Sequence, residues 1–130
     1  MRLIKEIKSK SGEVHFKRWL IWKGKNKEIY IHGIYKADKD KHLHNHPWDI
    51  WTIVLWGSYI EKLPRGKQCV RSIFNVRKSK AEEFHAIGYL ENPAYTLAIV
   101  GPRRNSDWGF LMNGETVQHE EYRKLKRKGK

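Results

Sequence analysis

The stretch HLHNHPWDIWTIVLWG, residues 42–57, sets alternating histidines directly before an apolar run. Residues 50–56 are rich in β-branched and aromatic side chains, a composition typical of a strand buried on both faces. Gly57 ends the run, and residues 58–63 continue as a partner strand. The sequence therefore predicts a central pair of strands with a polar, histidine-rich entrance, followed by a hairpin turn at residues 64–67.

The histidines in this entrance stand at every second position. Side chains two apart on a strand point to the same side, so His42, His44 and His46 are predicted to share one face. Pro47 follows them, which places the run at the mouth or edge of a sheet. Imidazoles on one face can bind one ion at roughly 2.0–2.1 Å. A metal site is predicted here in preference to scattered surface histidines.

Further strands are predicted before and after this pair of strands, with turn residues between them. Residues 115–128 contain helix formers but few apolar positions, so they are predicted as a helix or an extended tail. Many short strands predict an all-β sandwich or closed barrel. We expect one domain over 1–130, with its core at about 13–112 and a basic C-terminal tail at about 115–130. The additional strands are expected at 13–23, 28–36, 70–76, 95–100 and 108–112.

Composition limits the class of protein. The chain has 130 residues, of which 39% are hydrophobic, so one domain with a real core is expected. Its single cysteine, Cys69, excludes a disulfide framework or a cysteine-rich zinc site. No apolar run approaches the length of a membrane span and no signal peptide is visible, so a soluble, cytoplasmic protein is expected.

The formal net charge of +13 favours anionic partners. Part of the excess lies in residues 123–130, a basic terminus that is either a solvated end or a means of binding nucleic acid. The aromatic residues lie inside apolar strands and do not alternate with Lys and Arg, which argues against a platform for stacking bases. Nucleic-acid binding through the tail is therefore an alternative to a small-molecule function.

A third metal ligand must come from elsewhere in the chain. His85 enters a predicted strand from a charged loop, His119 lies in the polar tail, and His15 and His32 are lone strand histidines. By residue pattern alone, His85 is as well explained by a core or surface position as by a ligand.

The pattern around residue 44 resembles the first motif of the cupin superfamily, which is histidine, any residue, histidine, three or four residues, glutamate, six residues, glycine. His44, His46 and Gly57 fit this motif, but Ile50 stands where the glutamate is expected. The resemblance implies a cupin β-barrel (a jelly roll) with a divalent metal, Fe²⁺ being favoured and Zn²⁺, Ni²⁺ or Mn²⁺ being alternatives.

The second cupin motif supplies a histidine from a later strand, which the resemblance assigns to His85. The usual proline and glycine of that motif are replaced by Lys80 and Glu82. A narrower resemblance, to small cupins of phages and bacteria with an HxHPW motif, extends over residues 38–110. It implies His44, His46 and His85 as ligands and makes a homodimer an expectation. If the chain is phage-encoded, its location would be the host cytoplasm.

Ile50 at the glutamate position leaves the ligand set open. One interpretation is a three-histidine site, similar to that of cysteine dioxygenase-type cupins. Another is that Glu61 or Asp49 supplies the carboxylate, although Asp49 would face the wrong way without a bulge after Pro47. We prefer the three-histidine site, with Glu61 as a candidate catalytic acid or base.

Four further side chains are candidates for substrate binding. Trp48 and Tyr59 could form aromatic walls, Asp49 could add a carboxylate, and Arg103 could add a cation. The alternatives are a core role for the aromatic residues and an exposed loop for the arginine.

The function predicted first is a metal-dependent enzyme acting on a small polar or anionic molecule. It could be an Fe(II) dioxygenase-like oxidoreductase, or an isomerase or lyase. The alternatives are a non-catalytic cupin that binds a metal and a ligand, and the nucleic-acid-associated basic protein described above.

Overall fold

The computed structural model describes residues 1–37, 42–105 and 108–128, and its regular structure consists mainly of antiparallel strands. The predicted fold class, all-β with a short C-terminal helix, is confirmed. The elements are β1 (Arg2–Lys8), β2 (Val14–Lys23), β3 (Glu28–Ile34), β4 (Ile50–Trp56), β5 (Ser58–Lys62), η1 (Pro64–Gly66), β6 (Gln68–Ser72), β7 (Val76–Ser79), β8 (Ala86–Tyr89), β9 (Ala94–Val100), β10 (Gly109–Met112), β11 (Glu115–Gln118) and α1 (His119–Lys128).

The largest layer is a six-stranded sheet in the order β1-β2-β3-β9-β4-β7. Its inner face is set by the two-residue period of β9, because Ala94, Thr96, Ala98 and Val100 are all buried and the residues between them are not. Strand register then identifies the inner positions of the neighbouring strands, because Thr96 pairs with Val54 on β4 and with His32 on β3.

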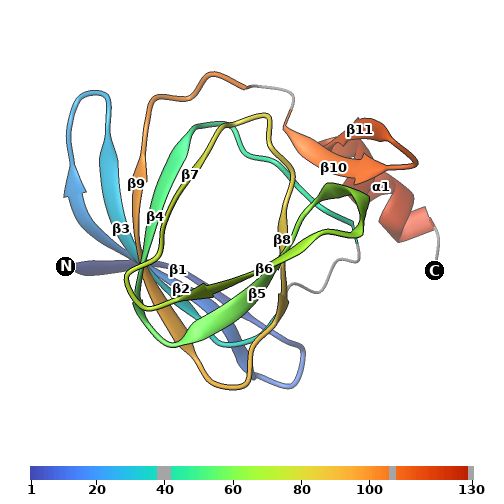
Figure 1. Ribbon diagram of the computed structural model, residues 1–130. Helices are drawn as coiled ribbons and strands as arrows, with labels where there is room; N and C mark the ends of the chain where they lie inside the picture. The colour runs from blue at the N-terminus through green and yellow to red at the C-terminus, as the bar shows by residue number, and fades with distance from the viewer. Residues whose placement is uncertain (38–41, 106–107, 129–130) are drawn as a thin grey trace.

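A three-stranded sheet, β6-β5-β8, faces the large one, and together the two layers form a barrel-like ring of strands (Figure 1). The layers meet over two small apolar clusters. One contains Ile34, Val54, Tyr59 and Ala94, and the other contains Tyr30, Ala98 and Val100.

The structure differs from the predicted strands at several places. Residues 58–63 are not the partner strand of 50–56, because β4 and β5 belong to different sheets and β5 pairs with β6 and β8. Residues 70–76 do not form one strand, because Phe74 adopts a left-handed φ of 68° and the chain turns there between β6 and β7. The sheet also begins earlier than expected, since Arg2–Lys8 pairs with β2. Residues 42–46 contain only an isolated β-bridge at His44 and no regular strand.

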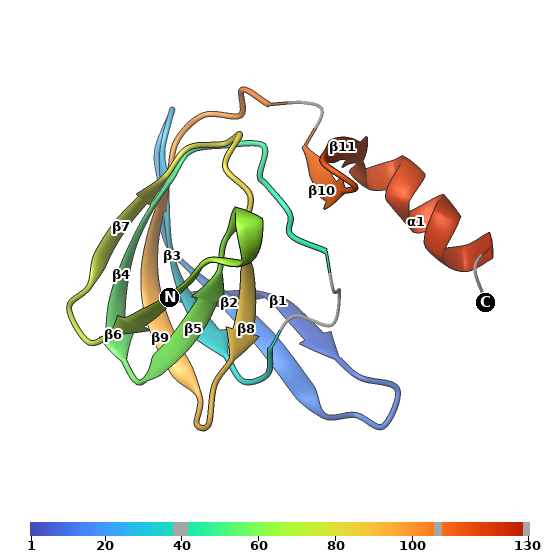
Figure 2. The same cartoon turned by 45° about the vertical axis from the view of Figure 1, so that its right-hand side comes forward.

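The C-terminal part forms a unit of its own beside the barrel, in which the β10–β11 hairpin leads into α1 (Figure 2). Aromatic stacking holds this unit together: Phe110 and Tyr122 lie with ring centroids 3.8 Å apart, and Trp108 and His119 with centroids 4.2 Å apart. The α1 helix, His119–Lys128, is too short and too polar to cross a membrane, and no other described helix is long enough. Nucleic-acid binding by this basic end stays a prediction.

Gly57 lets the chain pass from one sheet to the other between β4 and β5. It has a φ of +81°, and a Cβ added there would lie 2.7 Å from the carbonyl oxygen of Pro93. We expect Gly57→Ala to lower the free energy of unfolding by about 2–3 kcal/mol, because left-handed strain and a backbone clash add. Urea denaturation checks this. Gly12→Ala is the matched control, since Gly12 has a φ of +89° but no neighbour within 4 Å. A similar loss in both variants would contradict the role of the clash.

Candidate metal centre

The segment 43–46 is held between two other parts of the chain. On one side, His44 and His85 exchange two backbone hydrogen bonds of 2.9 Å, and the His46 N–H donates to the Ala81 carbonyl at 3.1 Å. On the other side, the Asn45 N–H donates to the Gly109 carbonyl at 3.0 Å. These bonds bring His44 and His46 beside His85, although the segment is not a regular strand.

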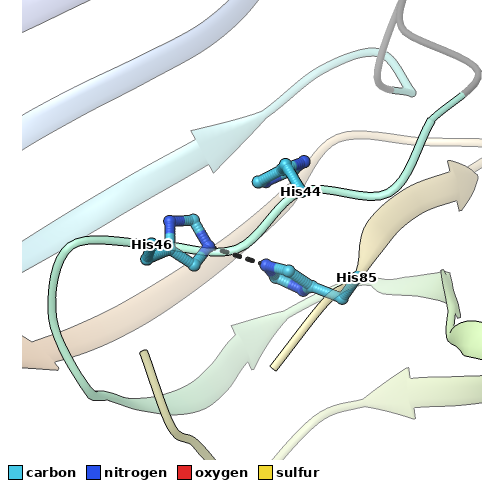
Figure 3. A group of neighbouring side chains, drawn as sticks. All are labelled: His44, His46 and His85. Carbon is cyan, nitrogen blue, oxygen red and sulfur yellow. Dashed lines mark hydrogen bonds between the residues drawn. The ribbon is translucent and has the colours of Figure 1, made fainter. Parts of the chain in front are cut away.

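The three histidines predicted as metal ligands lie together, and we call His44, His46 and His85 the histidine cluster (Figure 3). Their nearest ring nitrogens all lie within 4.8 Å of one another. His46 Nε2 and His85 Nε2 are 2.7 Å apart, so one donates a hydrogen bond to the other. Each of the three side chains is partly buried, and solvent still reaches it.

Glu61 stands behind His85 and not among the three rings. The Nδ1–H of His85 donates to Glu61 Oε2 at 2.7 Å, which leaves the lone pair on Nε2, the atom that faces His46. Arg71 Nε and Arg77 Nε each approach Glu61 Oε1 at 2.8 Å. A carboxylate on the far nitrogen of a ligating histidine fixes its tautomer and ring orientation, which is a common arrangement in metal sites.

Charges determine the ionisation of this group. Burial has the largest single effect and raises the pKa of Glu61, but the hydrogen bond and charge of His85, together with Arg77 and Arg71, outweigh it and lower the pKa to about 2. Burial lowers the pKa of His46 well below its usual value, and the charges of His85 and His44 lower it further. Glu61 is therefore ionised and His46 neutral at pH 7.

The number and kind of nitrogen donors in the histidine cluster suit a divalent ion. Two nitrogens that share an ion at 2.0–2.1 Å are at most about 4 Å apart, and the three nitrogens of the cluster lie within 4.8 Å of one another. Three neutral nitrogens suit iron, zinc, nickel or copper and leave coordination positions open. Among the described residues, no carboxylate belongs to the group. The residues thus support a divalent metal site but do not identify the metal.

Asp49, considered as a ligand or substrate contact, lies in an ionic group away from the cluster. Its Oδ1 accepts from Arg104 Nη2 at 2.7 Å and from the Ala81 N–H at 2.7 Å. Arg104 also pairs with Glu82 at 2.6 Å. Asp49 therefore fastens the segment around Ala81 to the loop after β9.

Trp48 and Arg103, two further predicted substrate contacts, lie against each other. The Arg103 guanidinium is 5.6 Å from the centroid of the Trp48 ring. Trp48 also packs on the core cluster of Tyr30, Ala98 and Val100, while Arg103 is exposed. Their contact with a substrate stays a prediction.

Tyr59 is buried in the other core cluster and lines a hollow of about 1010 Å³ around the β4–β5 turn and the β8–β9 loop. Trp56 and Tyr89 lie on this hollow and are largely exposed. None of the three clustered histidines lines it, so it is separate from the candidate metal centre. Tyr59 as a substrate contact also stays a prediction.

His42 does not join the cluster. Its Nδ1 hydrogen-bonds the hydroxyl of Tyr122 on α1 at 3.0 Å. Tyr122 stacks on Phe110, whose ring lies 6.0 Å from that of His44. His42 therefore connects the C-terminal helix α1 to the segment that carries the histidine cluster. The three-histidine interpretation does not need His42 as a ligand.

Sequence reasoning did not predict that two polar residues, Arg18 and His32, lie side by side on the inner face; His32 was weighed only as a possible third ligand. Arg18 pairs with His32 in register, and His32 pairs with the buried Thr96. A signal was present, because Arg18 lies between Phe16 and Leu20 in a strand whose alternate positions are apolar. A charged residue at a core-facing position of such a pattern indicates either that the predicted register is wrong or that the residue belongs to a binding site.

His32 is held neutral in this position. Burial lowers the pKa of His32 to about 3, and the charges of Arg18 and Lys5 act in the same direction. Arg18 Nε also donates to His32 Nε2 at 2.9 Å, so this nitrogen serves as an acceptor.

This shift predicts the acid sensitivity of the fold. The pKa of His32 is lower in the folded protein than in the unfolded chain, so between pH 6.5 and about 3 the unfolded chain binds a proton that the folded one does not. The contribution of His32 to the free energy of unfolding is complete above pH 6.5. It is lost as the pH falls, by at most about 1.4 kcal/mol per pH unit. We expect His32→Gln to reduce the slope of unfolding free energy against pH, measured by urea denaturation at pH 7 to 5. An unchanged slope would contradict it.

Comparison with known proteins gives matches in structure but not in sequence. No protein-family model and no curated protein matches the chain. Among solved structures, the polyketide cyclase RemF from Streptomyces resistomycificus has 14% identity and a TM-score of 0.65, over 85% of this chain and 79% of that one. An RmlC-like cupin from Desulfovibrio desulfuricans has 14% identity and a TM-score of 0.54, over 68% and 83%. The Fe(II) form of HppE has 13% identity and a TM-score of 0.61, over 74% and 55%.

These similarities, at low identity, concern the fold. The chain has the cupin fold, as the resemblance around His44 implied. The grouping of the three histidines supports metal binding.

Proposed function

We propose that this protein is a metal-dependent enzyme that acts on a small polar or anionic molecule, with a divalent ion held by the histidine cluster. Fe²⁺ is favoured over Zn²⁺, Ni²⁺ or Mn²⁺. The observation that carries the proposal is the cluster of three imidazoles backed by a buried carboxylate, in a domain that has apolar core clusters of its own. A bound ion would supply Lewis-acid chemistry or, as iron, redox chemistry with oxygen.

The side chains have distinct parts in this proposal. His85 presents the lone pair of its Nε2, and Glu61 orients it through its Nδ1–H. His44 and His46 would each supply a further nitrogen, His46 giving up its hydrogen bond to His85 Nε2 to do so. We retain Glu61 as a candidate acid or base, but its bonds to Arg71 and Arg77 favour an orienting role. Trp48, Asp49, Tyr59 and Arg103 remain proposed substrate contacts, and a homodimer remains an expectation.

The experiment begins with elemental analysis of the purified protein, followed by removal of metal and reloading with each candidate ion. The Fe²⁺ form is then offered thiols and small carboxylic acids while oxygen consumption is measured. The Zn²⁺, Ni²⁺ and Mn²⁺ forms are offered the same acids, and isomerised or cleaved products are sought by mass spectrometry. Turnover that disappears in a His46→Ala variant supports the proposal.

The same experiment separates the enzyme from its alternative, a non-catalytic cupin in which the ion only orients a ligand. Ligand binding that depends on metal, without turnover by any metal form, would reject catalysis and favour the binder. A protein that binds none of the four ions would reject both.

A further inference from the structure

Three side chains form a row across the inner face of the six-stranded sheet, one from each of β1, β2 and β3. Lys5 pairs with Arg18, and Arg18 pairs with His32. We call Lys5, Arg18 and His32 the basic row. The row continues through Thr96 and Val54, which are each 1% exposed, so it lies on the face that lines the barrel. Arg18 and His32 are partly buried, while Lys5 is exposed.

The two cations of the basic row face each other without a carboxylate. Among the residues that the structure describes, neither Lys5 nor Arg18 takes part in an ion pair, and the nearby Glu28 pairs instead with Lys23 at 3.9 Å. Like charges directly opposite on neighbouring strands are destabilising. Although the Lys5 residue as a whole is exposed, partial burial of its ammonium group has the largest effect and lowers its pKa, and the charge of Arg18 lowers it further. The protein thus maintains a local excess of positive charge at a cost in stability.

The Arg18 side chain is fixed in place. Its guanidinium lies 5.6 Å from the Phe16 ring centroid and 5.2 Å from that of Tyr30, and its Nε donates to His32. The two terminal nitrogens have no hydrogen bond to any other described side chain. A guanidinium fixed in this way presents a fork of donors that suits the two oxygens of a carboxylate or phosphate.

The basic row and the histidine cluster belong to the same interior. Arg18 lies 5.2 Å from the Tyr30 ring centroid, and Trp48 packs against the core cluster that contains Tyr30. Trp48 follows His46 by two residues, so the basic row and the segment that carries His46 border the same apolar core. A molecule bound at Arg18 would extend along this core toward the cluster.

We propose that the basic row binds an oxyanion group, either a carboxylate or a phosphate, of the molecule whose reacting end lies at the histidine cluster. The part of this inference that concerns the reacting end rests on the proposed function, whereas oxyanion binding by Arg18 does not. Arg18 supplies the donor fork, Lys5 adds charge, and His32 positions Arg18 by accepting from its Nε.

The test uses metal-free protein, so that its result does not depend on the metal centre. Binding of inorganic phosphate and of acetate is measured separately by isothermal titration calorimetry, at an ionic strength held constant with sodium chloride. We expect saturable binding of one anion, which assigns the class to phosphate or carboxylate, and at least a tenfold loss of affinity in Arg18→Gln. Lys17→Gln removes the same charge from the opposite face, where Lys17 pairs with Glu6 at 3.6 Å, and should bind like the wild type.

Several results would overturn the proposal. One such result is that the wild type binds neither anion. Another is an equal loss of affinity in Arg18→Gln and Lys17→Gln, which would show a general effect of net charge. If Arg18→Gln fails to fold by circular dichroism, Lys5→Gln is used instead. That variant should fold with a higher melting temperature than the wild type in the absence of phosphate or acetate, because the like-charge pair is removed, and it should bind the anion more weakly. Unchanged binding in Lys5→Gln would then contradict the proposal.

Discussion

Replacing His46 with alanine is expected to lower the affinity for a divalent ion by a factor of about 100 to 1000. Structural zinc sites with four ligands bind with apparent free energies of about 10–16 kcal/mol, so each ligand accounts for about 3 kcal/mol. His46 is one of the three proposed ligands, and its Nε2 lies 2.7 Å from that of His85, so the variant leaves two of the three nitrogens for the ion. Competition with a chelator of known affinity, followed by elemental analysis, measures the change.

The matched control for this variant is His15→Ala. His15 lies on β2, outside the histidine cluster, and its replacement should leave one ion bound per chain. Equal losses of metal in the two variants would indicate general damage to the fold. Full retention of metal by His46→Ala would show that another ligand set holds the ion.

Glu61→Gln is expected to lower the free energy of unfolding by about 3 kcal/mol. Glu61 is only 2% exposed and accepts from Arg71, Arg77 and His85, so the neutral amide leaves two partly buried guanidinium groups without their counter-charge. Removing one partner of a buried ion pair typically costs about 3–5 kcal/mol, and the partial exposure of the arginines places this case at the lower end. Urea denaturation of the metal-free protein measures the loss.

The same variant is expected to bind metal about 10 to 100 times more weakly, as is usual when the partner behind a ligating histidine is changed. Glu83→Gln is the control, because Glu83 is exposed and approaches Arg77 only at 3.6 Å. Its unfolding free energy should change by less than about 0.5 kcal/mol. A Glu61→Gln protein as stable as the Glu83→Gln protein would show that the buried ionic group contributes little.

The fold was predictable from the sequence where local composition determines it. The apolar run of Ile50–Trp56 forms β4 with the expected bounds, because seven residues rich in β-branched and aromatic side chains without a charge or breaker favour a strand. The expectation that it is buried on both faces is wrong, since Val54 is buried but Trp51, Leu55 and Trp56 are exposed. The segment 70–76 was not predictable in the same way. Its turn depends on Phe74 in a left-handed conformation, and an aromatic residue is not a recognised turn signal. The strand Arg2–Lys8 is exposed along its whole length, so its weak apolar pattern does not predict that it pairs.

The site was predictable in its ligands but not in its construction. His44 and His46 follow from their spacing and His85 from resemblance, but the bridge that joins them lies between segments far apart in the chain. Sequence also suggested Glu61 as a pocket residue. Its place behind His85 depends on Arg71 and Arg77 converging from β6 and β7, which the turn at Phe74 makes possible. His32 was weighed only as a third metal ligand and Arg18 was not considered, because their pairing between β2 and β3 on the inner face depends on sheet register, which the sequence does not show.

The isolated bridge between His44 and His85 has a consequence for how the protein unfolds. Two backbone hydrogen bonds close a loop of about forty residues at this point, and a ring nitrogen of each of the same two residues belongs to the histidine cluster. An ion bound there would act as a cross-link that the unfolded chain cannot form, so each tenfold excess of free metal over its dissociation constant would add about 1.4 kcal/mol of resistance to unfolding. The melting temperature would then report the occupancy of the site without any knowledge of the reaction.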